Sequence, residues 1–182
     1  MTADAARRGG VELTSTGVAG VGLLVVGIGD VRVTDVPEAR LVTYALGSCL
    51  GVAIHDPVAR VGGLLHVMLP DSAIDPVKAA QAPALFVDTG VPLLFRESYR
   101  LGARKERLVV RVVGGSHAAA READDRFQIG RRNVSALRRI LARNGVPVTA
   151  EDVGGCQRSR TVTLDVATGA LTVRVDGRDV AL

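Results

Sequence analysis

The middle of the chain alternates short apolar runs with turn residues, a pattern typical of β-strands. Apolar runs occupy residues 41–46, 50–54 and 61–68, and each has the length of a strand. Asp56-Pro57 lies between the last two runs and predicts that they form a hairpin. A shorter run at 23–26 predicts the first strand of the domain.

Two longer segments carry a helical pattern. Residues 84–101 predict a helix, but Gly90 and Pro92 interrupt it. Because an internal proline removes a hydrogen bond, we expect this helix to be kinked or to begin near Asp88. Residues 129–144 place apolar side chains on one face and predict an amphipathic helix.

The rest of the chain predicts loops and further strands. Residues 71–82 and 116–128 are polar and are expected to be loops. Further strands are expected at 108–113, 146–148, 160–166 and 171–175. About seven to nine strands with two long helices favour a mixed α/β layered domain over a repeated βαβ unit.

Composition indicates one globular domain. The chain has 182 residues, of which 47% are hydrophobic, enough for a packed core. We expect residues 1–20 to be a mobile tail and residues 21–182 to form the domain. The apolar run at 18–26 is broken by glycines and is too short to cross a bilayer, so no signal peptide or membrane span is expected and a cytoplasmic location is favoured.

Charge and potential ligands narrow the classes of function. The net charge of +4 and the 3% of aromatic residues give little support for nucleic-acid binding, and a mixed-charge solvated surface is the simpler interpretation. The two cysteines and three histidines have no zinc-ligand spacing, and no phosphate-binding glycine loop is present. Neither a metal nor a cofactor is therefore expected.

Cys49 is the strongest candidate nucleophile. It follows Gly47-Ser48, where a sharp turn between apolar runs would expose the thiol and aim backbone N–H groups at one point. Such N–H groups can hold the oxyanion of a tetrahedral intermediate, with Gly47 and Ser48 supporting it. The alternative is a small cysteine buried in a strand.

His66 and Thr43 could complete a catalytic set. His66 lies on the strand after the Asp56-Pro57 turn, so a hairpin would bring it next to Cys49 if both share a face. An imidazole beside a thiol promotes its ionisation, which predicts a lowered pKa for Cys49. The hydroxyl of Thr43 could accept the other ring N–H and fix the tautomer. Alternatively, His66 is a core histidine and Thr43 an ordinary strand residue.

The remaining candidates are weaker. His55 precedes the Asp56-Pro57 turn and is expected to be solvated at a loop tip. His117 is expected to be peripheral, and Cys156 has no histidine at a suggestive spacing and is expected to be a bystander thiol.

Five segments in order make the chain resemble the CheD family, the chemoreceptor glutamine deamidases of bacterial and archaeal chemotaxis. They are 43–49 (TYALGSC), 62–70 (GGLLHVMLP), 113–115 (VGG), 129–133 (IGRRN) and 152–155 (DVGG) with Arg160 beyond. The resemblance implies a three-layer α/β sandwich related to deamidating bacterial toxins. It also implies Cys49 as nucleophile, His66 as base and Thr43 as the residue that assists the histidine.

The resemblance further implies a protein-glutamine glutaminase without a cofactor. Its substrate would be the cytoplasmic helices of chemoreceptors, its intermediate a thioester, and a CheC-type phosphatase would be a partner in some lineages. Two alternatives stay open: a transglutaminase-like thiol enzyme, and a non-catalytic adaptor that regulates a CheC-type phosphatase.

Overall fold

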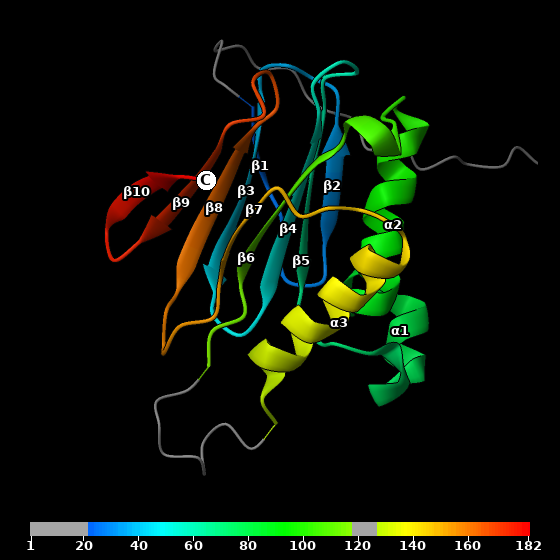
Figure 1. Cartoon of the computed structure of the whole chain (residues 1–182), viewed down its shortest axis with the longest axis vertical. Helices are drawn as coiled ribbons and strands as arrows, with labels where there is room; N and C mark the ends of the chain where they lie inside the picture. The colour runs from blue at the N-terminus through cyan, green and yellow to red at the C-terminus, as the bar shows by residue number, and fades with distance from the viewer. Residues whose placement is uncertain (1–21, 118–126) are drawn as a thin grey trace, which may run out of the picture.

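The computed structural model describes residues 22–117 and 127–182. Two five-stranded sheets lie face to face, and the helices cover the outer face of one of them (Figure 1). The expected mobile tail at 1–20 and most of the expected loop at 116–128 lie outside the described residues. Within those residues, the three-layer α/β arrangement is confirmed.

One sheet, here called sheet A, has the strand order β1-β3-β8-β9-β10. Its strands are β1 (Gly22–Val25), β3 (Ala39–Leu46), β8 (Arg160–Asp165), β9 (Leu171–Val175) and β10 (Arg178–Ala181). β1 runs parallel to β3, and the other neighbours are antiparallel. The predicted strands at 41–46, 160–166 and 171–175 are confirmed, with small shifts at their ends.

The second sheet, sheet B, has the order β2-β5-β4-β6-β7. Its strands are β2 (Val31–Thr34), β5 (Val61–Val67), β4 (Leu50–Asp56), β6 (Val109–Gly114) and β7 (Ala150–Val153). β4 and β5 form the predicted antiparallel hairpin about Asp56-Pro57. Every residue of β4 and β5 is buried, because sheet A covers one face of these strands and helices cover the other.

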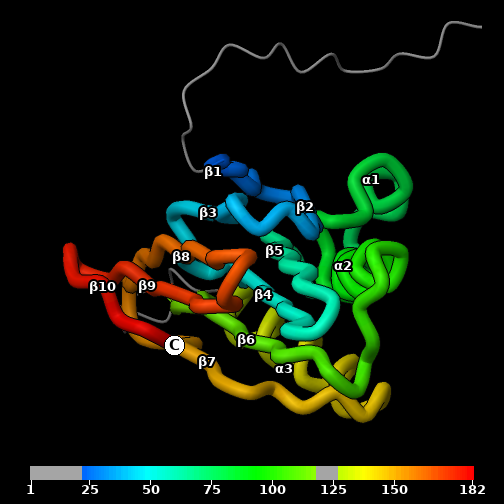
Figure 2. Tube along the Cα trace, turned by 90° about the horizontal axis from the view of Figure 1, so that it is seen from above, coloured from blue at the N-terminus to red at the C-terminus, as the bar shows by residue number. Residues whose placement is uncertain are grey.

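The helices α1 (Pro76–Gln81), α2 (Val87–Arg100) and α3 (Ile129–Arg143) lie on the same side of sheet B (Figure 2). α2 begins next to Asp88, as one of the two alternatives predicted, and keeps Pro92 inside it. A short 3-10 turn at Pro83–Leu85 precedes it. The predicted apolar face of α3 is buried or partly buried against sheet B and consists of Val134, Leu137, Ile140 and Leu141.

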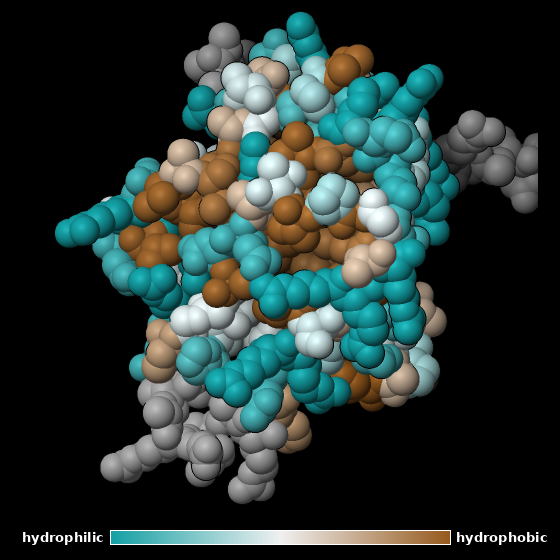
Figure 3. Space-filling model, in the orientation of Figure 1, coloured by the Kyte–Doolittle hydropathy of each residue, from teal (hydrophilic) through white to brown (hydrophobic). Residues whose placement is uncertain are grey.

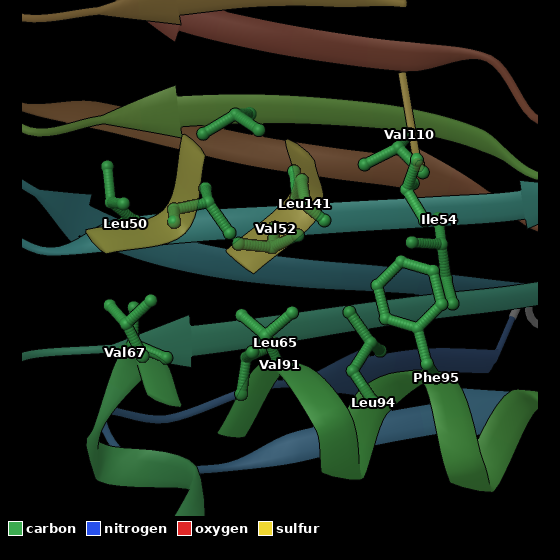
Figure 4. Close-up of a cluster of buried hydrophobic side chains, with 14 of the residues drawn as sticks. Leu50, Val52, Ile54, Leu65, Val67, Val91, Leu94, Phe95, Val110 and Leu141 are labelled. Atoms are coloured by element: carbon green, nitrogen blue, oxygen red, sulfur yellow. The ribbon is translucent and has the colours of Figure 1, made fainter. Parts of the chain in front are cut away.

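Two apolar clusters separate the three layers. One lies between sheet B and the helices and joins Leu50, Val52 and Ile54 of β4 to side chains of α2 and α3 (Figure 4). The other lies between the two sheets and includes Leu41 of β3 and Leu64 of β5. Successive strand residues point to opposite faces, so each position of β4 and β5 can be assigned to one cluster.

Three predictions of secondary structure were wrong. Residues 71–82 are not a loop, because Asp71 and Asp75 cap a 3-10 turn and the helix α1 with their side chains, and Pro76 suits a first helical position. Residues 146–148 are not a strand; the chain pairs with β6 only from Ala150 onward. The number of strands is also higher than expected, because the short β2 and the exposed β10 were missed.

Candidate active site

Cys49 lies where the chain crosses from one sheet to the other. β3 belongs to sheet A and β4 to sheet B, and residues 47–49, here called the Cys49 turn, connect them. Just before this turn, near the end of β3, Ala45 has a left-handed backbone (φ 57°), and the N–H of Gly47 donates to the carbonyl of Ala45 at 2.9 Å. The predicted sharp turn between apolar runs is therefore a crossover between sheets.

Cys49 and His66 lie on the same face of sheet B. His66 is opposite Gly51 in the β4–β5 register, and Cys49 precedes Gly51 by two positions. Such diagonal neighbours have Cα atoms about 7–8 Å apart, within reach of a long side chain. Cys49 packs against the cluster between the sheets, and His66 has the strand parity of Leu64 in that cluster. The side chain of Leu46 occupies the space beside Gly51, because a Cβ on Gly51 would lie 2.8 Å from Cδ1 of Leu46.

Thr43 reaches His66 from the other sheet and fixes its tautomer. The hydroxyl of Thr43 lies 2.7 Å from the carbonyl oxygen of Val26 and 2.7 Å from Nδ1 of His66. A hydroxyl has one proton, and the carbonyl can only accept it. The Thr43 oxygen must therefore accept a hydrogen bond from Nδ1–H of His66, which leaves Nε2 with a free lone pair.

Burial controls the protonation of both groups. His66 is 1% exposed, and this burial lowers its pKa to about 4, so the ring is a neutral base near pH 7. Burial also raises the pKa of the Cys49 thiol, an effect that its own backbone N–H partly offsets. The expected lowered pKa of Cys49 is thus wrong, because desolvation of a thiolate between the sheets outweighs the opposing effect of the Cys49 N–H.

The resting pair is therefore a thiol and a neutral imidazole. Nε2 of His66 is buried and has no hydrogen-bond partner among the described residues, the Cys49 thiol included. In unliganded enzymes the bond between nucleophile and base is often not yet formed. Cys49 itself is partly exposed, so the thiol is not sealed in the interior.

A second turn, residues 114–116 and here called the glycine turn, holds the carbonyls of the Cys49 turn. The N–H groups of Gly115 and Ser116 donate to the carbonyls of Cys49 and Gly47, each at 2.8 Å. Gly114 has φ 114°, and a Cβ there would overlap the carbonyl oxygen of Cys49. The glycine pair at 114–115, which the sequence marked only as part of the VGG segment, is thus required for close backbone approach.

Arg160 holds this glycine turn in place. Its guanidinium makes two hydrogen bonds to Asp152, at 2.8 and 2.9 Å, and one to Oγ of Ser116 at 2.8 Å. Arg160 is 1% exposed. Its hydrogen bonds to the Asp152 carboxyl, and to a lesser extent its positive charge, lower the pKa of that carboxyl. Sequence reasoning gave this pair no role, although both residues lie in a segment that carries the family resemblance.

A second missed residue is Asn133 of α3, which is fully buried. Its side-chain nitrogen donates to the carbonyls of Ser48 and Met68, both at 3.0 Å. It therefore contacts the Cys49 turn directly. The only sequence signal was its place in the IGRRN segment.

The other candidates lie elsewhere. His55 was expected to be solvated, but it is 5% exposed, and its Nε2 lies 3.1 Å from the carbonyl of Val166, because the β8–β9 turn packs over it. His117 is paired through its backbone with Cys156, whose thiol is exposed. None of these three residues forms a hydrogen bond with the Cys49 thiol or the His66 ring.

A hollow of about 540 Å³ lies between α2 and α3, away from this site. Val91, Phe95 and Ile140 are among its apolar lining residues, and Figure 3 shows apolar side chains gathered on this face beside α2 and above α3. Over residues 22–117 and 127–182, no three acidic, cysteine or histidine side chains come together as a metal site. No helix in those ranges is long and apolar enough to cross a membrane.

Comparison with known proteins places the chain in a family. The family described as CheD chemotactic sensory transduction matches residues 68–175. A probable chemoreceptor glutamine deamidase CheD 2 from Anaeromyxobacter dehalogenans is 51% identical over 84% of this chain and 94% of its own length. The chain belongs to the CheD family.

Other CheD proteins extend the match across bacteria and archaea. A probable chemoreceptor glutamine deamidase CheD 1 from Syntrophus aciditrophicus is 45% identical over 86% of this chain and 96% of its own. One from Thermococcus kodakarensis is 40% identical over 82% of this chain and 90% of its own. The region that matches the CheD family description begins at residue 68, after Thr43, Cys49 and His66, so their roles are argued from geometry.

Proposed function

We propose that this CheD-family protein is a protein-glutamine deamidase that converts glutamine side chains of chemoreceptors to glutamate. The observation that carries the proposal is the Thr43–His66 hydrogen bond, which leaves Nε2 of His66 unprotonated on the face that carries the Cys49 thiol. A thiol beside a neutral imidazole is the arrangement used in nucleophilic attack on amides. The names of the relatives supply the substrate class.

Attack begins with a neutral pair. Because the pKa of Cys49 is raised and that of His66 lowered, the thiol keeps its proton at rest. As Sγ forms a bond to the carboxamide carbon, Nε2 of His66 takes the thiol proton. The C=O π pair moves to oxygen and gives a tetrahedral oxyanion.

Backbone N–H groups of the Cys49 turn stabilise this oxyanion. The N–H groups of Ser48 and Cys49 make no backbone hydrogen bond within the described part of the chain. The Cys49 N–H also partly offsets the rise that burial causes in the pKa of its own thiol. Gly47 supports the same turn through its carbonyl bond to Ser116.

Collapse of the intermediate releases ammonia and then glutamate. Protonated His66 donates its proton to the leaving nitrogen as the C–N bond breaks, which leaves a γ-glutamyl thioester on Cys49. His66 next takes a proton from water, and the hydroxide attacks the thioester carbon. The C–S bond breaks, the sulfur regains its proton from His66, and the carboxylic acid product loses its proton to solvent to give the carboxylate.

The cellular setting follows from the resemblance and the substrate class. The cytoplasmic helices of chemoreceptors would place the reaction in the cytoplasm. The resemblance also implies a CheC-type phosphatase as a second partner in some lineages. New carboxylates on a receptor helix repel like charges nearby and can bias the signalling state.

Mass spectrometry of a receptor cytoplasmic fragment tests the proposal. Incubation with the wild type should add about 1 Da at specific glutamines and release ammonia without an added amine, since water completes the reaction. Cys49→Ala should abolish both signals, whereas Cys156→Ala, which removes the exposed thiol, should leave them unchanged. Equal turnover by the wild type and Cys49→Ala would refute the proposal, and a strict need for an added amine would favour the transglutaminase-like alternative.

A further inference from the structure

All three peptide carbonyls of the Cys49 turn are held by hydrogen bonds. Those of Gly47 and Cys49 accept from the backbone N–H groups of Ser116 and Gly115. The middle carbonyl, that of Ser48, accepts from a side chain, Nδ2 of Asn133, at 3.0 Å. Asn133 therefore completes a set of tethers that fixes every peptide plane of the turn.

The orientation of Asn133 is determined by its surroundings. Its two recorded partners, the carbonyls of Ser48 and Met68, are both acceptors, so the amide nitrogen must face them. Its Oδ1 is then buried without a partner among the described residues. An apolar side chain would fill this space without leaving a buried oxygen unpaired. The two N–H donors therefore explain the presence of asparagine here.

The position of the Ser48 carbonyl sets the direction of the next N–H. In a trans peptide, the C=O of Ser48 and the N–H of Cys49 share one plane and point in opposite directions. Asn133 draws the carbonyl toward α3, on the helix side of sheet B. The Cys49 N–H is thereby turned to the opposite side, where the cluster between the sheets contains the Cys49 side chain.

We infer that Asn133 is a positioning residue that aims the Cys49 N–H at the oxyanion of the deamidation intermediate. The inference rests on the proposed function. The second bond of Asn133, to Met68, ties the same amide to the strand end two residues beyond His66. One side chain of α3 thus fixes the nucleophile turn relative to the strand that carries the base.

The test separates oxyanion stabilisation from thiol reactivity. Deamidation passes through an oxyanion, whereas alkylation of Cys49 by iodoacetamide is a displacement at a saturated carbon and forms none. Asn133→Ala should lower kcat about tenfold or more with KM within about twofold. The alkylation rate of Cys49 should stay within about threefold of the wild type.

A matched control lies one turn further along α3. Leu137→Ala removes a fully buried side chain that contacts the helix-side cluster and has no bond to the Cys49 turn, so its kcat should stay within about twofold. If Asn133→Ala does not fold, Asn133→Ser replaces it, because the shorter hydroxyl cannot reach both carbonyls.

Amide hydrogen exchange of the peptide that contains Gly115 and Ser116, whose N–H groups donate to the carbonyls of Cys49 and Gly47, supplies a readout without substrate. Asn133→Ala should speed its exchange, and Leu137→Ala should not. Unchanged exchange, unchanged kcat, or alkylation that falls in step with kcat would overturn the inference. A wild type with normal protection of the turn but no deamidation would instead refute the proposed function.

Discussion

His66 is held in one protonation state and one tautomer by two independent features. Burial lowers its pKa to about 4. The Thr43 hydroxyl donates a hydrogen bond to the carbonyl of Val26, and its oxygen accepts one from Nδ1–H of His66. The lone pair on Nε2 is therefore available throughout the neutral range. At the residue scale, the site is prepared for proton transfer before any substrate arrives.

The lowered pKa of His66 predicts a pH dependence of stability. In the unfolded chain the ring titrates near its ordinary pKa of about 6.5, whereas in the folded protein it titrates near about 4. The unfolded state therefore binds more protons between these values, and the free energy of unfolding falls as the pH drops through that window. We expect this one group to remove about 3 kcal/mol between pH 7 and pH 4.

Urea unfolding of the wild type and His66→Gln at pH 7 and pH 4 measures this contribution. Carboxyl groups destabilise both proteins equally in acid, so the difference between the two losses isolates the histidine. Equal losses in both proteins would show that His66 titrates normally in the folded state.

Thr43→Val tests the tautomer argument, because it keeps the shape of the side chain and removes its oxygen. Without that acceptor, the Nδ1 proton is no longer held in place and the neutral ring can place its proton on Nε2. We expect kcat to fall about 10- to 100-fold with little change in KM. Thr163→Val, a partly exposed change on β8, should leave both constants unchanged.

At the scale of elements, the first turn of α3 lies directly against the glycine turn that supports Cys49. A Cβ on Gly130 would overlap the carbonyl oxygens of Gly115 and Ser116. In an ordinary helix, replacing glycine with alanine stabilises by about 1 kcal/mol. Here the close approach to the carbonyls of Gly115 and Ser116 makes the same substitution destabilising.

Gly130→Ala should therefore lower the free energy of unfolding by about 1–3 kcal/mol through overpacking, and should lower deamidation as well. Thermal unfolding and turnover on a receptor fragment measure the two effects. Ser135→Ala, on an exposed position of the same helix, should be neutral. A more stable and fully active Gly130→Ala would contradict the close packing described.

The far end of the β4–β5 hairpin is closed by a buried carboxylate. Asp56 is fully buried and accepts hydrogen bonds from the guanidinium of Arg107 and from the N–H groups of Val58, Ala59 and Arg104. Burial alone would raise the pKa of Asp56, but these donors, led by Arg107, hold it well below its usual range.

Arg107→Ala would leave this charge buried with backbone donors alone. We expect the Tm at pH 7 to fall by about 5 °C or more. Arg174→Ala, which breaks the exposed pair with Asp179, should shift Tm by less than about 2 °C. Similar shifts in the two variants would mean that the buried carboxylate does not depend on Arg107.

At the scale of the whole molecule, the site is divided between the two sheets. Thr43 belongs to sheet A, whereas His66 belongs to sheet B and Cys49 precedes its strand β4. The geometry of the catalytic set therefore depends on how the sheets pack against each other. The helix layer contacts this site through the N-terminal part of α3, where Asn133 donates to the Ser48 carbonyl.

Two adjacent leucines of β5 allow the effect of sheet packing to be distinguished from that of the helix layer. Leu64 faces the cluster between the sheets and Leu65 faces the helices, and both are fully buried. Truncation to alanine should cost about 2–5 kcal/mol in either case. Under conditions where both variants are folded, Leu64→Ala should lower kcat several-fold and Leu65→Ala should not; the reverse order would contradict the dependence on sheet packing.

Local pattern predicted much of this arrangement. The turn at Asp56-Pro57 predicted the hairpin, and the hairpin made it plausible that Cys49 and His66 share a face. Thr43 was identified from its place on the strand that leads to the cysteine and from the family resemblance. All of these relations depend on residues close together in the sequence.

Contacts between distant segments could not be predicted in this way. Pairing of β3 with β8 places Thr43 opposite Val162, and nothing near either residue indicates that partner. The same holds for Asn133, for Arg160 and for buried His55. The direction of the Cys49 pKa shift was missed for a related reason, because desolvation is set by the packing of two sheets and not by the neighbouring residues in the chain.

The division of the site between two sheets has a consequence during synthesis on the ribosome. Thr43, Cys49 and His66 all emerge well before residue 160, and the β4–β5 hairpin needs only its own residues. Strand β3, however, has only the short β1 as a neighbour until β8, which begins at Arg160, and an isolated pair of strands is marginal in water. A growing chain thus carries the proposed nucleophile and base early, but Thr43 can hold His66 in place only after β8 has emerged.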